Sequence, residues 1–211
     1  MNKKQNIIIV LIVLALIGVG VIGYCFYSKN NQEDNVIKNE EVENNNIVNE
    51  ELMAAHRNYI QELTNGGADV NAQGQEGVTA LIVASTWGYY DMVKELINAG
   101  ADVNMVDSRG ATALIYASLA GHLNIVKELI SVGANVNIIA NDGSTALMIA
   151  GAFPHSNTKL SDIVDIVKEL IAVGADVNAK NFEGQTVLMF ASGNYPQTDI
   201  VKILKEAGAK E

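Results

Sequence analysis

The side chains that most often perform chemistry in a protein are histidines, and this chain has three, His56, His122 and His155. No two of them have the spacing that would place both on one face of a helix, so the sequence predicts no metal site. His155, Ser156 and Asp162 could be arranged as a base, a nucleophile and an orienting acid. Three polar residues in one short stretch are a weak signal, and we therefore expect no catalytic residues.

A glycine pattern typical of dinucleotide sites occurs near the N-terminus. Residues 18–23 read GVGVIG, which satisfies G-x-G-x-x-G. That motif binds a cofactor only when a strand precedes it and the helix of a βαβ unit follows it. Here a polar tract rich in asparagine follows instead, so we expect no bound cofactor.

Side-chain oxygens recur at a fixed interval further along the chain. One slot holds Asp69, Asp102, Asn135 and Asp176, and a second slot, two residues later, holds Asn71, Asn104, Asn137 and Asn178. Calcium needs several oxygens gathered in one loop, whereas these groups occur once per interval. The regular recurrence favours a structural role, in which short polar side chains bond to the backbone of loops.

Two phrases alternate along most of the chain. VKELINAGADVN at 93–104 recurs as VKELISVGANVN at 126–137 and as VKELIAVGADVN at 167–178. The second phrase, EGVTALIVAS at 76–85, has three later copies whose starts are separated by 33, 33 and 41 residues. Similarity at a nearly constant period predicts an array of stacked repeats.

The copy at 107–137 shows what one repeat builds. Gly110 predicts a turn, and Thr112 is a candidate N-cap for a short apolar helix that ends at Gly121. Asn124 is a candidate N-cap for a second helix that ends at Gly133. The apolar stripe of that helix consists of Ile125, Val126, Leu129 and Ile130. Two such helices cannot fold alone, but stacked copies bury a continuous core.

These motifs resemble the ankyrin repeat family, in the period of 33, the Thr-x-Leu opening of the first helix and the G-A-D-V-N exit loop. The resemblance covers about residues 51–211 and suggests a membrane-anchored, bacterial-type member of the family. It implies an all-α repeat fold, an ankyrin solenoid of helix-turn-helix units with β-turn or hairpin loops. We expect a cap at 51–73 and repeats at 74–106, 107–139, 140–180 and 181–211.

One departure from the family pattern concerns its T-P-L-H phrase, which reads Thr-Ala-Leu or Thr-Val-Leu here. The histidine position is occupied by Ile82, Ile115, Met148 and Met189. A hydrogen bond between threonine and histidine is therefore unavailable, and we expect apolar packing between repeats to replace it.

The period is broken most strongly in the third repeat, where eight additional residues lie between Ala150 and Val167, and the last repeat has one additional residue at the matching place. The eight residues fall between the two helices of the third repeat, in the segment 151–165. Insertions of this kind often contribute to binding, although a long surface loop is also tolerated at small cost.

The N-terminus predicts a membrane anchor. Residues 1–6 are basic, residues 7–27 are uncharged and almost wholly apolar, and residues 28–50 form an Asn- and Glu-rich tether. As a helix, the apolar stretch would span about 31 Å, close to the thickness of the hydrocarbon layer. The positive-inside rule places the N-terminus in the cytoplasm and the repeats outside, periplasmic in a cell with two membranes. The alternatives are a cleaved signal peptide, which gives a secreted protein, and a cytoplasmic repeat domain.

Composition narrows the kind of partner. The formal charge is −10, with 14 basic residues among 211, which argues against binding to nucleic acid. The single cysteine excludes a disulfide within the chain. Over 51–211 the acidic excess persists, so a basic or polar protein is the favoured partner.

The sequence thus predicts a non-catalytic scaffold that is tethered to a membrane and binds another protein, with no small-molecule substrate. The alternatives are a stabiliser or regulator of an envelope enzyme, and an enzyme that uses the 151–165 loop. In ankyrin arrays the turn tips and the exposed end of the first helix usually bind partners. Those positions here are Gln75, Glu76, Val78, Thr86, Trp87, Ser108, Arg109, Leu119, Asn141, Asp142, Phe153, Phe182 and Glu183.

Overall fold

The computed structural model describes residues 69–152, 159–193 and 198–210, and these residues form a stack of helical pairs. After the short 3-10 helix η1 (Gln75–Gly77), the pairs are α3 (Ala80–Trp87) with α4 (Tyr90–Asn98), α5 (Ala113–Ala120) with α6 (Leu123–Ser131), α7 (Ala146–Ala152) with α8 (Leu160–Ala172), and α9 (Val187–Ser192) with α10 (Thr198–Glu206). The expected anchor at 7–27, the tether at 28–50 and most of the cap at 51–73 lie outside the described residues.

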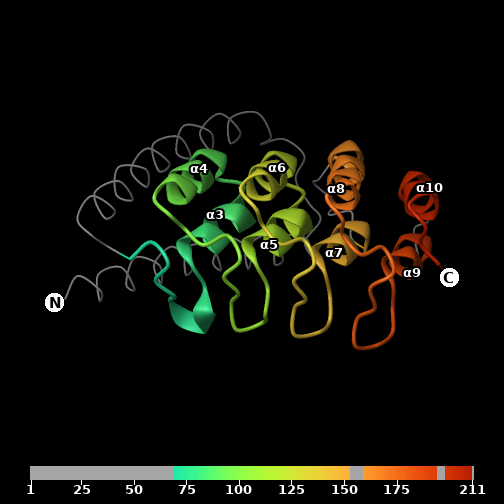
Figure 1. Ribbon diagram of the computed structural model, residues 1–211, viewed down its shortest axis with the longest axis horizontal. Helices are drawn as coiled ribbons and strands as arrows, with labels where there is room; N and C mark the ends of the chain where they lie inside the picture. The colour runs from blue at the N-terminus through green and yellow to red at the C-terminus, as the bar shows by residue number, and fades with distance from the viewer. Residues whose placement is uncertain (1–68, 153–158, 194–197, 211) are drawn as a thin grey trace, which may run out of the picture.

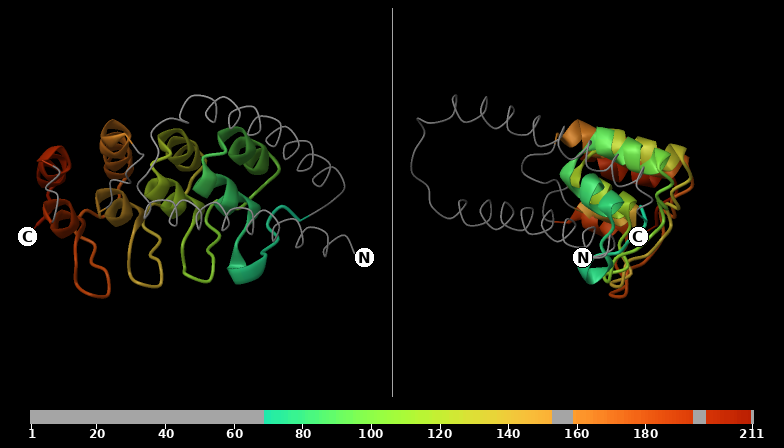
Figure 2. Two further views of the ribbon diagram at one scale, coloured as in Figure 1. Left: turned by 180° about the vertical axis from the view of Figure 1, so that it is seen from behind. Right: turned by 90° about the vertical axis from the view of Figure 1, so that its left-hand side faces the viewer.

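The pairs are arranged in two layers. The first helices α3, α5, α7 and α9 form one row, and the second helices α4, α6, α8 and α10 form another row above it (Figure 1). Each first helix packs on its own second helix and on the first helix of the next repeat. A loop precedes each first helix and projects from the opposite side of the first row (Figure 2). The predicted all-helical repeat fold is confirmed.

Threonine caps and glycine stops set the bounds of the first helices. Thr112 Oγ1 accepts a hydrogen bond from Ile115 N at 3.2 Å, and Thr79, Thr145 and Thr186 make the equivalent bond. The first helices α3 and α5 end at Gly88 and Gly121, which adopt the left-handed conformation that glycine reaches without strain. Both features agree with the prediction.

The second helices begin differently from the prediction. Helix α6 starts at Leu123, so Asn124 is its second residue and not its N-cap. The reason is that the His122 carbonyl already accepts the Val126 N–H at 3.0 Å, directly after the turn at Gly121. The His122 side chain makes no capping hydrogen bond.

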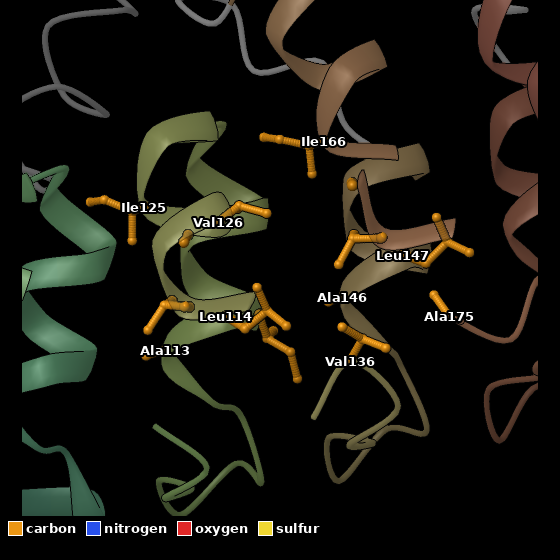
Figure 3. Close-up of a cluster of buried hydrophobic side chains, with 14 of the residues drawn as sticks. Ala113, Leu114, Ile125, Val126, Val136, Ala146, Leu147, Ile166 and Ala175 are labelled. Carbon is orange, nitrogen blue, oxygen red and sulfur yellow. The ribbon is translucent and has the colours of Figure 1, made fainter. Parts of the chain in front are cut away.

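The core lies between the two layers and runs through all the described repeats. Leu114 and Leu147 face it from the first helices, and Val126 and Ile166 face it from the second helices (Figure 3). Of the residues that replace the family's histidine, Ile82, Ile115 and Met148 are buried, as the apolar-packing prediction requires. Met189 is 50% exposed, since no further first helix packs on α9 among the described residues.

The eight-residue insertion is partly helical. Helix α8 has thirteen residues whereas α4 and α6 have nine each, so four of the additional residues form one more turn at its N-terminus. Residues 153–158 lie outside the described residues. Part of what the sequence predicts to be a loop at 151–165 is therefore a helix.

The described residues include no helix that is long and apolar enough to cross a membrane, and the predicted anchor is not among them.

Candidate functional site

Four loops that share the same pair of backbone hydrogen bonds precede the first helices, although the third residue has a positive φ only in the first of them, at Glu76. We call them tip 1 (74–78), tip 2 (107–111), tip 3 (140–144) and tip 4 (181–185). In each tip the first residue donates its N–H to the carbonyl of the fifth, and the glycine at the fourth position donates to the carbonyl of the first. That glycine has a positive φ in every tip. Only tip 2 has a bridge of β type, between Val106 and Thr112, and the described residues contain no strand.

Hydrogen bonds join neighbouring tips into a row. Ser108 N donates to Glu76 O at 2.7 Å, and Asn141 N donates to Arg109 O at 2.7 Å. Phe182 N donates in the same way to Asp142 O, at 3.1 Å. Because each tip is bonded to the next, the row presents its side chains at fixed spacing, and a partner would meet a preorganised surface.

The third position of each tip carries a charged side chain, namely Glu76, Arg109, Asp142 and Glu183 in order along the row. Arg109 lies 3.7 Å from Glu76, and both side chains are well exposed. An exposed pair of this kind contributes little to stability, so these charges remain available to a partner.

The residues four positions after each capping threonine are all half-buried: Val83, Tyr116, Ile149 and Phe190. Two of them, Tyr116 and Ile149, line a pocket of about 500 Å³ together with residues of tips 2 and 3. We call this hollow between the tips and the first helices the groove, with Tyr116 and Ile149 as its apolar floor. These floor residues are not among those predicted from the sequence, although each stands at a fixed distance from its capping threonine.

Asp107 ties tip 2 to the groove floor. Its Oδ1 accepts hydrogen bonds from Arg109 N at 2.9 Å and Ala111 N at 3.0 Å, and its Oδ2 accepts one from the Tyr116 hydroxyl at 2.6 Å. Burial and this hydrogen bond to Asp107 raise the pKa of Tyr116 to about 12. The phenol therefore stays protonated and holds the tip against α5.

The residues predicted for binding fall into two groups. Those on the tips are exposed, apart from the half-buried Val78: Gln75, Glu76, Ser108, Arg109, Asn141, Asp142, Phe182 and Glu183. Those at the ends of first helices are half-buried, namely Thr86, Trp87 and Leu119. The Thr86 hydroxyl bonds back to Ile82 O at 2.8 Å, and its carbonyl faces His122 Nε2 at 3.3 Å. Phe153 lies outside the described residues.

The exit loops, between each second helix and the next tip, have the structural role predicted for them. Asn71 Oδ1 accepts from Asp102 N at 2.7 Å, and Asn104 Oδ1 accepts from Asn135 N at 2.7 Å. Asn137 and Asn178 repeat the contact, and their amides also donate to carbonyls of the following loop. These bonds tie each exit loop to the next, and we call them the asparagine ladder.

Little in the described residues suggests metal or catalytic chemistry. Within the ranges that the structure describes, no group of three His, Cys, Asp or Glu residues could hold a metal ion. His122 is half-buried, and burial lowers the pKa of its imidazole. His56, His155 and Ser156 lie outside the described residues, so the proposed nucleophile set is not assembled in them.

The paired helices, the exit loops and the row of tips together define a helical repeat solenoid with one grooved face. Family comparison then specifies the class. A model of three consecutive ankyrin repeats matches residues 27–107, 51–141 and 100–160, and a single ankyrin repeat matches 142–182. The chain belongs to the ankyrin repeat family. No curated protein sequence matches it. Ankyrin repeats serve as protein–protein interaction scaffolds and are generally non-catalytic.

Proposed function

We propose that the protein binds another protein through the groove between the tip row and the first helices. The observation that carries this proposal is the pocket of about 500 Å³ between tips 2 and 3, whose floor includes the half-buried Tyr116 and Ile149. An apolar floor below a polar rim is typical of a site that takes a large side chain of a partner. The bonded tip row reduces the ordering cost of binding.

The charge of the described residues favours a basic partner. They carry fifteen Asp and Glu against nine Lys and Arg, a net charge of −6. A surface of one sign attracts partners of the opposite sign and speeds their association. This supports the partner class expected from the sequence.

The setting we propose for this binding is the outer side of a membrane. Residues 7–27 would anchor the chain, with residues 28–50 as a tether and the repeats outside; the support is the uncharged 21-residue stretch and the lysines before it. A bacterial envelope protein would then recruit or stabilise a partner, which could itself be an enzyme. Secretion after cleavage of residues 1–27 is the alternative location.

Site-specific photo-crosslinking in cells tests the groove and the location together. A photoreactive amino acid placed at Ser108, in the lining of the pocket, should form a covalent adduct with a protein. The matched control is Ser131, an exposed serine on α6 in the same repeat, which should form none. Protease added to spheroplasts should then remove the adduct. Equal adducts from both positions would refute the groove, and protection from protease in spheroplasts but not in lysates would refute the outer location.

A further inference from the structure

Phe182, on tip 4, is the most exposed large apolar side chain of the described residues, with 75% of its surface accessible. The equivalent position carries Ser108 in tip 2 and Asn141 in tip 3. The ring lies against the preceding tip, since its Cδ1 atom is 2.9 Å from where a Cβ on Gly143 would be. One edge of the ring thus lies close to Gly143 in tip 3, and most of the side chain remains open to solvent.

Two acidic residues neighbour Phe182 along the backbone. Asp142 is joined to Phe182 through the 3.1 Å bond between their backbones, and Glu183 is the next residue in the chain. The Asp142 oxygens accept from the Ser144 N–H at 2.8 Å and from the Ser144 hydroxyl at 3.0 Å. Among the described residues, neither Asp142 nor Glu183 forms an ion pair with a lysine or an arginine.

The basic residues near the tip row leave this end acidic. Arg109 lies two tips away from Phe182, where it is 3.7 Å from Glu76 and lines the central pocket with Asp142. Lys180 directly precedes tip 4, at the position held by Val106 and Ile139 in the earlier repeats, and its single charge leaves an acidic excess beside Phe182. An exposed aromatic ring with two acidic residues next to it in the backbone is complementary to a planar cation, because the ring attracts the cation and the carboxylates can accept its N–H groups.

We propose that Phe182, Asp142 and Glu183 form a docking site for an arginine side chain of the partner protein. A guanidinium can stack on the ring and donate hydrogen bonds to both carboxylates at once, which an ammonium cannot match in geometry. The inference rests on the proposed groove and adds the chemistry of one anchor: an arginine at tip 4, next to an apolar side chain in the central pocket.

The test uses random twelve-residue peptides displayed on phage and selected on the full chain in detergent. Peptides that bind should share an arginine close to a large apolar residue. Changing that arginine to alanine should weaken binding about tenfold, and changing it to lysine should weaken it less. On a chain with D142N and E183Q, the same arginine change should have a clearly smaller effect, because only the stacking on Phe182 is left to lose.

Three further variants locate the effect. Phe182→Leu should reduce the arginine preference, whereas Glu76→Gln, which removes a carboxylate at the far end of the row, should leave it intact. Phe182 and Glu76 are both exposed, so the urea midpoint of these two variants should stay unchanged. Ile149→Arg fills the pocket and should abolish binding of every selected peptide.

The outcomes separate the two proposals. Peptides that lose binding on Ile149→Arg but share no arginine, or whose arginine matters equally on the D142N and E183Q chain, would overturn the arginine site and leave the groove standing. Peptides indifferent to Ile149→Arg, or a selection without binders, would overturn the groove and this inference with it.

Discussion

The exit loops and the tips both recur in every repeat. The exit loops keep one side chain constant, whereas the tips keep their backbone hydrogen bonds constant and vary their side chains. In the exit loops the second slot is always asparagine, at Asn71, Asn104, Asn137 and Asn178, and each side chain bonds to the following exit loop. In the tips the backbone bonds are constant, but the third position changes from Glu76 to Arg109, Asp142 and Glu183.

This difference between exit loops and tips indicates which side chains hold neighbouring repeats together and which positions can vary without loss of stacking. A side chain that carries an inter-repeat bond must recur in every copy, because the loss of one bond leaves backbone groups unpaired. The tips are joined by a backbone hydrogen bond at every step, and a side chain adds to it where Asn141 Nδ2 donates to Ser108 O at 2.8 Å. The third-position side chains are therefore not required for stacking. A surface with a fixed frame and variable side chains is what recognition requires.

The fourth-position glycine of the tips is constant, although the tips vary in their other side chains. Replacing it should have the largest effect and tests whether the tips are rigidly joined. A Cβ on Gly143 would lie 2.6 Å from Phe182 N and 2.8 Å from Asn181 Cα, whereas a Cβ on Gly184 would meet nothing within 4 Å. Both residues have a similar positive φ. We expect Gly143→Ala to lower the free energy of unfolding by roughly 3 kcal/mol and Gly184→Ala by about 1 kcal/mol, the cost of left-handed alanine alone.

Urea unfolding of the two glycine variants measures this difference. Because the conformational cost is shared, the excess for Gly143→Ala reports the contact between tips 3 and 4. Equal losses would mean that the tips are not tightly joined, and the rigid frame inferred for the groove would then be wrong.

The asparagine ladder should show the next largest effect. Asn137 accepts from Asp176 N at 2.9 Å and donates to Gly174 O at 3.0 Å. Asn137→Ala removes both bonds between exit loops and should cost about 2 kcal/mol in urea unfolding. The control is Asn124→Ala on α6, whose exposed side chain bonds to none of the described residues and whose change should lie within about 0.5 kcal/mol. A loss at position 137 no larger than that of the control would contradict a structural ladder.

Much of the fold could be predicted because its signals are local and repeated. Thr112 caps α5 and Gly121 ends it, as their residue types indicate. The start of α6 could not be read in the same way, since the left-handed turn at Gly121 lets the helix begin before Asn124. The additional turn of α8 was likewise hidden, because composition alone did not separate its residues from the rest of the insertion.

The site was predicted only in part for a related reason. Tip residues such as Arg109 and Phe182 follow from the repeat boundaries and are exposed as expected. The groove floor was missed, because Tyr116 and Ile149 belong to apolar helices and their residue types do not show which face is half-buried. In the structure, the hydrogen bond from Tyr116 to Asp107 and the pocket that Tyr116 shares with tips 2 and 3 show that this side of α5 faces the tips.

His122 also joins two repeats, but unlike the ladder asparagines it does not recur at the same position in the other repeats. Its Nε2 lies 3.3 Å from Thr86 O, and burial lowers the pKa of its imidazole below the ordinary value of 6.5. The unfolded chain therefore takes up the proton first as pH falls. The stability that neutral His122 contributes is present above pH 6.5 and is lost as pH falls through the folded-state pKa.

Urea unfolding of the wild type and of His122→Gln, at intervals from pH 7.5 to pH 5, should show this loss. At pH 7.5 the wild type should be more stable than His122→Gln, by less than the loss expected for Gly143→Ala or for Asn137→Ala. This difference in stability should shrink steadily toward pH 5. Carboxylates titrate in both chains, so the difference between the curves isolates the imidazole. Parallel curves would mean that His122 binds protons equally in the folded and unfolded chain. Its contact with Thr86 would then not contribute a pH-dependent stability.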